Sequence, residues 1–121
     1  MRAIFILFTS SSEVRVEKRK SVRYEVQFPV SFSGHEVTGR GLVTSLSHEG
    51  CSVSSEEAVR PKAYLVLRLQ LPEQHPPLRI EAAEVRWSSG SGFGLEFMHL
   101  RAEEQERLRR FIAWLETTQN N

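Results

Sequence analysis

The sequence predicts a mainly β fold: a six-stranded antiparallel β-barrel followed by one C-terminal α-helix. Short runs alternate apolar and polar residues with a period of two, which is typical of half-buried strands. Links of hairpin length, rich in Gly, Pro and Ser, separate these runs. After residue 100 the period changes to that of an amphipathic helix, which can close one open end of a barrel.

The first three strands are expected in residues 26–32, 37–46 and 51–54. In the first, the apolar residues occupy every second position. Pro29 falls on its outer phase, where the missing N–H suits an edge position. The second strand is expected to carry Leu42, Thr44 and Leu46 on one face and Val43, Ser45 and Ser47 on the other.

The last three strands are expected in residues 63–71, 78–87 and 93–97. Leucine at alternate positions makes the first of these the strongest candidate. In the next, the apolar phase slips between Ala82 and Ala83, as it does at a β-bulge. The apolar side chains are Leu78, Ile80 and Ala82 before the slip, and Ala83, Val85 and Trp87 after it.

Helical spacing then predicts an amphipathic helix over residues 101–117. Its apolar positions are Leu108, Phe111, Ile112 and Leu115. Glu103 with Arg107, and Glu106 with Arg110, are i,i+4 pairs in the favourable order, and each pair is worth about 0.2–0.5 kcal/mol.

The composition excludes several classes of enzyme. All 15 acidic residues are Glu, and the chain contains no Asp. An EF-hand loop requires Asp or Asn at its early positions, and the only Asn residues are Asn120 and Asn121. A kinase or P-loop magnesium site and an aspartic protease require Asp. Ser47, His48 and Glu49 contain the residue types of a hydrolytic triad, but adjacent side chains diverge and no nucleophile elbow is present. The sequence therefore predicts a protein that is not an enzyme.

Neither a metal site nor a membrane span is expected. The four His residues show no ligand spacing, and the single Cys51 reads as a small buried residue that alternates with Val53. We accordingly expect no metal and no cofactor. The longest apolar run, Ala3 to Phe8, is too short for a membrane span or a signal-peptide core. These features favour a cytoplasmic protein.

Although the net charge of the chain is +1, its charged residues are unevenly distributed. Residues 1–23 hold six basic and two acidic residues, a net charge of +4, whereas residues 24–121 hold ten basic and thirteen acidic residues, a net charge of −3. Residues 1–14 are expected to form a flexible leader. A basic arm beside an acidic body suits an anionic partner, either a nucleotide, a nucleic acid or a membrane surface, although a solvated tail has the same composition.

Two short motifs are candidates for binding such a partner. Arg19 and Arg23 form Arg-x-x-x-Arg directly before the first strand. Guanidinium groups at this spacing suit a compact dianion, because arginine binds phosphate oxygens and guanine O6 and N7 bidentately. Ser45, Ser47 and Gly50 form Ser-x-Ser-x-x-Gly, in which both serines project from one face of a strand. Gly50 is expected to permit the turn and the close approach of a ligand.

In this order the motifs resemble those of the PilZ domain family. That family joins an Arg-x-x-x-Arg leader to a six-stranded barrel with an (Asp/Asn)-x-Ser-x-x-Gly turn between its second and third strands. The resemblance covers residues 15–117 and includes a segment similar to the family's closing hairpin, from Val85 to Phe97. It implies one domain over residues 15–121. Its parts are the basic segment 15–23, the barrel 24–99 and the helix 101–117.

The resemblance implies binding of the bacterial second messenger cyclic di-GMP, with Arg19 and Arg23 around the guanines and phosphates and Ser47 and Gly50 on the opposing wall. The family's Asp or Asn is Ser45 here. A lost hydrogen bond to a charged group costs about 1.5–3 kcal/mol, roughly a 10- to 100-fold loss of affinity, so weakened binding is expected. Lys18 is basic, and in PilZ-like domains a basic residue there accompanies two stacked ligand molecules.

Three hypotheses follow. The first is a cyclic di-GMP receptor or adaptor module that orders its basic N-terminal segment on binding and acts on an unidentified protein target. The alternative is a degenerate PilZ-like interaction adaptor that does not bind the nucleotide, which Ser45 favours. The third is a small nucleic-acid-binding barrel. The negative charge of the body speaks against it, as does the expected position of Phe28 and Phe32 in the core rather than on a stacking surface.

Overall fold

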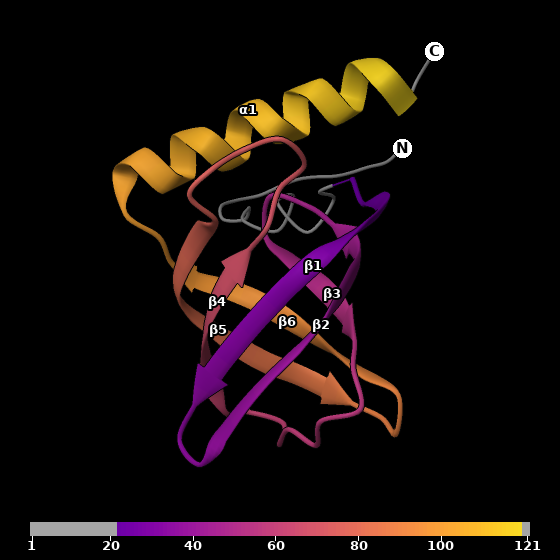
Figure 1. Ribbon diagram of the computed structural model, residues 1–121, viewed down its shortest axis with the longest axis vertical. Coiled ribbons are helices and arrows are strands. Elements are labelled where there is room, and N and C mark those ends of the chain that lie inside the picture. Colours follow the sequence, from indigo (N-terminus) through magenta and orange to yellow (C-terminus); the bar gives the residue numbers. More distant parts are fainter. Residues whose placement is uncertain (1–21, 120–121) are drawn as a thin grey trace, which may run out of the picture.

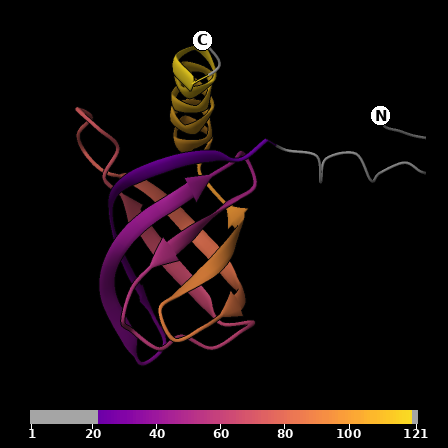
Figure 2. The same cartoon turned by 90° about the vertical axis from the view of Figure 1, so that its right-hand side faces the viewer.

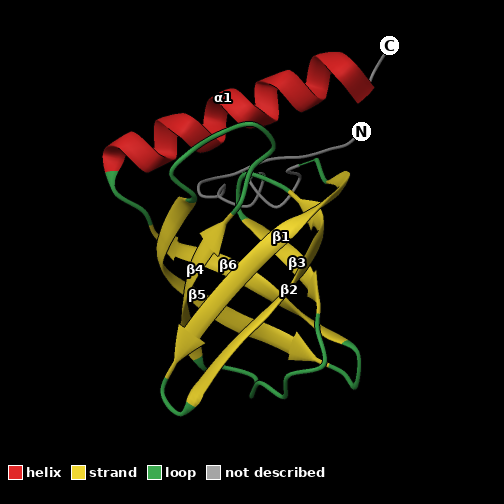
Figure 3. Ribbon diagram, in the orientation of Figure 1, coloured by secondary structure: helices red, strands yellow, loops and turns green. Residues whose placement is uncertain are grey.

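The structure is a computed structural model that describes residues 22–119. It contains a closed six-stranded antiparallel barrel and one C-terminal helix, so the predicted fold class is confirmed (Figures 1 and 3). The elements are β1 (Tyr24–Gly34), β2 (Val37–Leu46), β3 (Gly50–Ser54), β4 (Tyr64–Leu69), β5 (Leu78–Ser88), β6 (Gly92–His99) and α1 (Ala102–Gln119).

The strands follow the order β1-β2-β3-β6-β5-β4, and pairing of β1 with β4 closes the barrel. Closure leaves β1 without the free edge that Pro29 suggested. Pro29 instead lies where β1 extends beyond its partner, because the pairing with β4 begins at Val30 and Leu69. The Pro29 carbonyl accepts a hydrogen bond from the backbone N–H of Gln70 at 2.9 Å. Its missing N–H therefore interrupts no β1–β4 pair.

Apolar side chains fill the barrel and the space under α1. Phe32 and Phe93 meet edge to face inside the barrel, with ring centroids 5.1 Å apart. The four predicted apolar positions of the helix are all buried. Phe111 meets Phe28 of β1 edge to face at 5.9 Å. Figure 2, in which α1 is seen end-on, shows the helix above one end of the barrel with the β4–β5 loop beside it.

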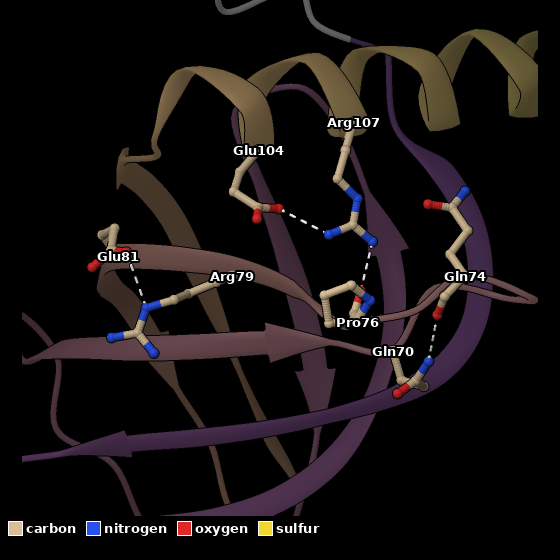
Figure 4. A network of polar contacts seen from close by, with 7 residues as sticks. All are labelled: Gln70, Gln74, Pro76, Arg79, Glu81, Glu104 and Arg107. Carbon is tan, nitrogen blue, oxygen red and sulfur yellow. Dashed lines mark hydrogen bonds and ion pairs between the residues drawn. The ribbon is translucent and has the colours of Figure 1, made fainter.

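Arg107 fastens the helix to this loop. Its guanidinium contacts Glu104 at 3.1 Å and donates to the carbonyl oxygen of Pro76 at 2.6 Å (Figure 4). Arg107 thus pairs with Glu104 rather than with the expected Glu103. The predicted pair of Glu106 and Arg110 is present at 3.1 Å. Arg107 therefore connects α1 to the β4–β5 loop through its hydrogen bond to Pro76.

Bulges change which side chains face outward. The predicted irregularity at Ala82 and Ala83 is present as a register shift between β5 and β6. A further shift between Val85 and Trp87 turns Trp87 outward, where it is 50% exposed. In β2, a shift between Val43 and Ser45 buries Val43 and leaves Leu42 39% exposed. The expectation that Leu42 and Leu46 share a face is therefore wrong, because the bulge lies between them.

Candidate ligand-binding site

A pocket of about 500 Å³ opens on the outside of the barrel, across the neighbouring strands β2, β3, β6 and β5. Its polar and aromatic lining includes Arg23, Ser45, Ser52, Arg86, Trp87 and Glu96. Arg23 enters this lining because it directly precedes β1, whose first residues pair with the end of β2. The pocket therefore lies where the N-terminal segment joins the barrel.

The structure brings several predicted site residues together. Arg23, Ser45 and Ser47 all line the pocket. The Arg23 guanidinium donates from Nη1 to Ser45 Oγ at 2.9 Å, although the two residues lie 22 positions apart in sequence. Lys18 and Arg19 lie outside the described residues. The second arginine of one motif thus contacts the first serine of the other.

Ser47 maintains the turn between β2 and β3. Its side chain is buried, and its Oγ accepts hydrogen bonds from the backbone N–H groups of Glu49 at 3.1 Å and Gly50 at 3.2 Å. A serine that closes a turn onto its own backbone in this way is a common local motif. Ser47 shapes the pocket by holding this backbone in place.

Gly50 has a different role from the one expected. It is buried at the start of β3, and no described glycine has a positive φ. The expectation that Gly50 permits the turn through backbone freedom is therefore wrong. A Cβ at this position would overlap the carbonyl oxygen of Leu95 on β6. Glycine is needed because β3 and β6 approach each other closely beneath the pocket.

Charges of opposite sign balance on the described wall. Arg23 and Arg86 oppose Glu49 and Glu96 in the lining. The Arg86 guanidinium is already paired with Glu96 and lies 3.6 Å from Glu84. The wall alone therefore offers an anion little net attraction.

Trp87 and Ser52 are lining residues that sequence reasoning missed. Periodicity alone places Trp87 on the apolar face of β5, but the second bulge turns it outward. Its indole lies against Gly94 of β6, where a Cβ would overlap the ring. Ser52 lies opposite Ser45 in the β2–β3 register, and their Oγ atoms are 2.6 Å apart. The alternation of β3 was the available signal for Ser52, because it placed this residue outward.

Cys51 lies beneath the same wall and is fully buried. Burial raises the pKa of the thiol to about 12, although the positive charge of Arg23 opposes the shift. The thiol therefore stays protonated at neutral pH and packs as a small apolar group.

Two further features concern only residues 22–119. No group of three or more His, Cys, Asp or Glu side chains there is arranged to hold a metal ion. No helix in this part of the chain combines the length and apolar character that a membrane crossing requires.

The fold and the pocket together define a class: a small closed β-barrel with a capping helix and a polar outer pocket where the N-terminal segment joins the first strand. The sequence model of the PilZ domain matches residues 17–114. The chain belongs to the PilZ domain family. No curated protein matches it.

Solved structures share this fold. Bacillus subtilis MotI/DgrA, an inhibitor of motility, superposes with a TM-score of 0.71 at 22% identity, over 93% of this chain and 58% of its own. The chain thus spans 58% of that protein's length. The PilZ domain of CeSA from a cellulose-synthesizing bacterium superposes with a TM-score of 0.60 at 19% identity, over 79% of this chain and 99% of its own. K. pneumonia MrkH, solved as a complex with c-di-GMP, superposes with a TM-score of 0.62 at 15% identity, over 88% of this chain and 56% of its own.

Proposed function

We propose that this protein is a cyclic di-GMP receptor or adaptor module, and that ligand binding orders its basic N-terminal segment against the barrel. The hydrogen bond between Arg23 and Ser45 carries the proposal, because it joins the two candidate motifs at one pocket. Family membership and the likeness to MrkH, solved with c-di-GMP, add support.

The pocket offers a contact for each part of such a ligand. Arg23 keeps N–H donors beyond the one bonded to Ser45, and these suit phosphate oxygens or the guanine O6 and N7 atoms. The half-exposed indole of Trp87 offers a flat surface for a base, a contact worth about 1–3 kcal/mol. Ser47 and Gly50 hold the backbone of the wall.

Residues 15–23 would then act as a clamp on the barrel of residues 24–99, with the helix of residues 101–117 as part of the same domain. Arg19 would contact the ligand from the side opposite the wall, and Lys18 would favour two stacked molecules. The dianionic ligand would lie between two positively charged groups, the earlier residues of this segment and Arg23, and would draw the segment against the barrel. An unidentified protein target would recognise the ordered segment.

A receptor role agrees with the chemistry of the site better than catalysis does. The buried Ser47 hydroxyl is bonded to the turn, and the Cys51 thiol is protonated at neutral pH, so neither is an activated nucleophile. We propose a non-enzymatic module that acts in the bacterial cytoplasm.

The competing function is an interaction adaptor that does not bind the nucleotide. Two observations favour it: Ser45 lacks the carboxylate of the family motif, and Arg86 is already paired with Glu96. Such an adaptor would bind its protein target equally well with and without the nucleotide.

Isothermal titration of the whole chain with cyclic di-GMP tests the proposal. We expect micromolar or tighter binding, weakened about 10- to 100-fold in Arg23→Ala, because a charge-assisted contact is lost. Arg40→Ala is the matched control, since Arg40 is an exposed β2 arginine that does not line this pocket. A flat titration of the wild type at millimolar ligand would refute the receptor function and leave the adaptor.

Ordering of the N-terminal segment has its own test. Hydrogen exchange at the backbone amides of residues 15–23 should slow when the ligand binds. Unchanged exchange alongside a positive titration would show that the segment does not act as a clamp.

A further inference from the structure

Ser52 belongs to a cluster of hydroxyl groups at the pocket. It faces Ser45 across the β2–β3 register at 2.6 Å between Oγ atoms. The β2 bulge between Val43 and Ser45 also brings Thr44 Oγ1 to 3.0 Å from Ser52 Oγ. Together with Arg23, these side chains form one connected cluster, and neither sequence motif contains Ser52.

Donor and acceptor chemistry allows an arrangement in which each hydroxyl of the cluster donates one hydrogen bond. An arginine guanidinium can only donate, so Ser45 Oγ accepts from Arg23 at 2.9 Å. The Ser45 hydroxyl can then donate its hydrogen to Ser52 Oγ, and the Ser52 hydroxyl can donate its hydrogen to Thr44 Oγ1. The Thr44 hydrogen reaches the Ser52 carbonyl oxygen at 3.4 Å. In this arrangement every hydroxyl hydrogen is used, and Ser45 and Ser52 each keep one unused lone pair.

These two lone pairs belong to oxygens that both line the pocket. Two acceptors 2.6 Å apart can receive two parallel hydrogen bonds from adjacent donors on one planar group. The Watson–Crick edge of guanine carries such a pair, N1–H and the 2-amino group. Adenine does not, because its N1 is an acceptor.

We propose that Ser45 and Ser52 together form an uncharged bidentate acceptor for N1–H and the 2-amino group of a guanine base. Ser52 supplies the second acceptor oxygen that a carboxylate at position 45 would otherwise provide. The uncharged pair adds no negative charge to a lining that already contains Glu49 and Glu96. This inference rests on the proposed function, because it assigns the base contact of the same ligand.

Titrations with cyclic di-GMP and with its hypoxanthine analogue, cyclic di-IMP, test the inference. The analogue keeps N1–H but lacks the 2-amino group. Ser52→Ala should weaken cyclic di-GMP binding about 5- to 10-fold, as expected for one uncharged hydrogen bond. It should also reduce the wild-type preference for guanine over hypoxanthine to less than about twofold. Ser54→Ala, an exposed serine two residues along β3 that does not line this pocket, should change neither value.

A second background sharpens the test. In Ser45→Asp a carboxylate supplies both acceptor oxygens, so Ser52→Ala should then change affinity less than about twofold. Equal losses in both backgrounds would overturn the inference, as would a wild type that does not distinguish the two ligands. If the wild type binds and Ser52→Ala binds equally well, this inference fails while the receptor function stands. If the wild type binds neither ligand, the receptor function fails and takes the inference with it.

Discussion

The contact between Gly94 and Trp87 predicts a substitution whose effect on stability changes sign with its background. Gly94 lies in β6, and the three atoms nearest to a Cβ built there all belong to the Trp87 indole. Gly94→Ala must therefore move the indole off the barrel surface. The backbone φ of Gly94 is not positive, so an alanine at this position brings no backbone strain.

The magnitude follows from the exposure of Trp87. A fully buried aromatic side chain removes roughly 150–250 Å² from water, so half burial corresponds to about 100 Å². At about 25 cal/mol per Å², complete loss of this burial costs up to about 2.5 kcal/mol. Replacing glycine by alanine in a strand returns about 0.5–1 kcal/mol. Gly94→Ala should thus lower the free energy of unfolding by up to about 2 kcal/mol.

In a Trp87→Ala background the clash is absent, and the same substitution should raise the free energy of unfolding by about 0.5–1 kcal/mol. Urea denaturation of the four proteins, followed by far-ultraviolet circular dichroism, measures this coupling. Gly90→Ala is the control, because no atom lies within 4 Å of its Cβ position and its effect should be equal in both backgrounds. Equal destabilisation by Gly94→Ala with and without Trp87 would refute the reasoning.

Three further predictions concern the pocket wall. Burial raises the pKa of the Cys51 thiol from 9.0 to about 12, so the folded protein should lose stability as the pH rises from about 9 towards 12. Urea unfolding of Cys51→Ala over this pH range should lack that loss. Ser47→Ala should lower the free energy of unfolding by about 1–3 kcal/mol, since two turn N–H groups lose their acceptor, and an unchanged urea midpoint would contradict this role. Glu96→Gln should tighten cyclic di-GMP binding about 2- to 5-fold by releasing Arg86, whereas weaker binding on titration would show that the ion pair supports the site.

The sequence motifs pointed to part of the pocket, and cross-strand pairing supplied the rest. Ser45 was identifiable because it lies at fixed spacing from Ser47 and Gly50. Trp87 was not, because a register shift in β5 turns it outward. Alternation placed Ser52 on the outer face of β3, but its pairing with Ser45 depends on the register shift in β2. The spacing of residues along one strand does not predict which residues of the neighbouring strand lie opposite them.

Periodicity is a local property of the chain, so the sequence alone predicted the six strands, the capping helix and the bulge at Ala82 and Ala83. It also indicated that the basic charge precedes the first strand. Only the tertiary structure determined that Trp87 faces outward over Gly94 and that Arg23, Ser45 and Ser52 form one cluster. The physical reason is closure of the barrel, since each strand's register is set by the fit of its side chains to two neighbours at once.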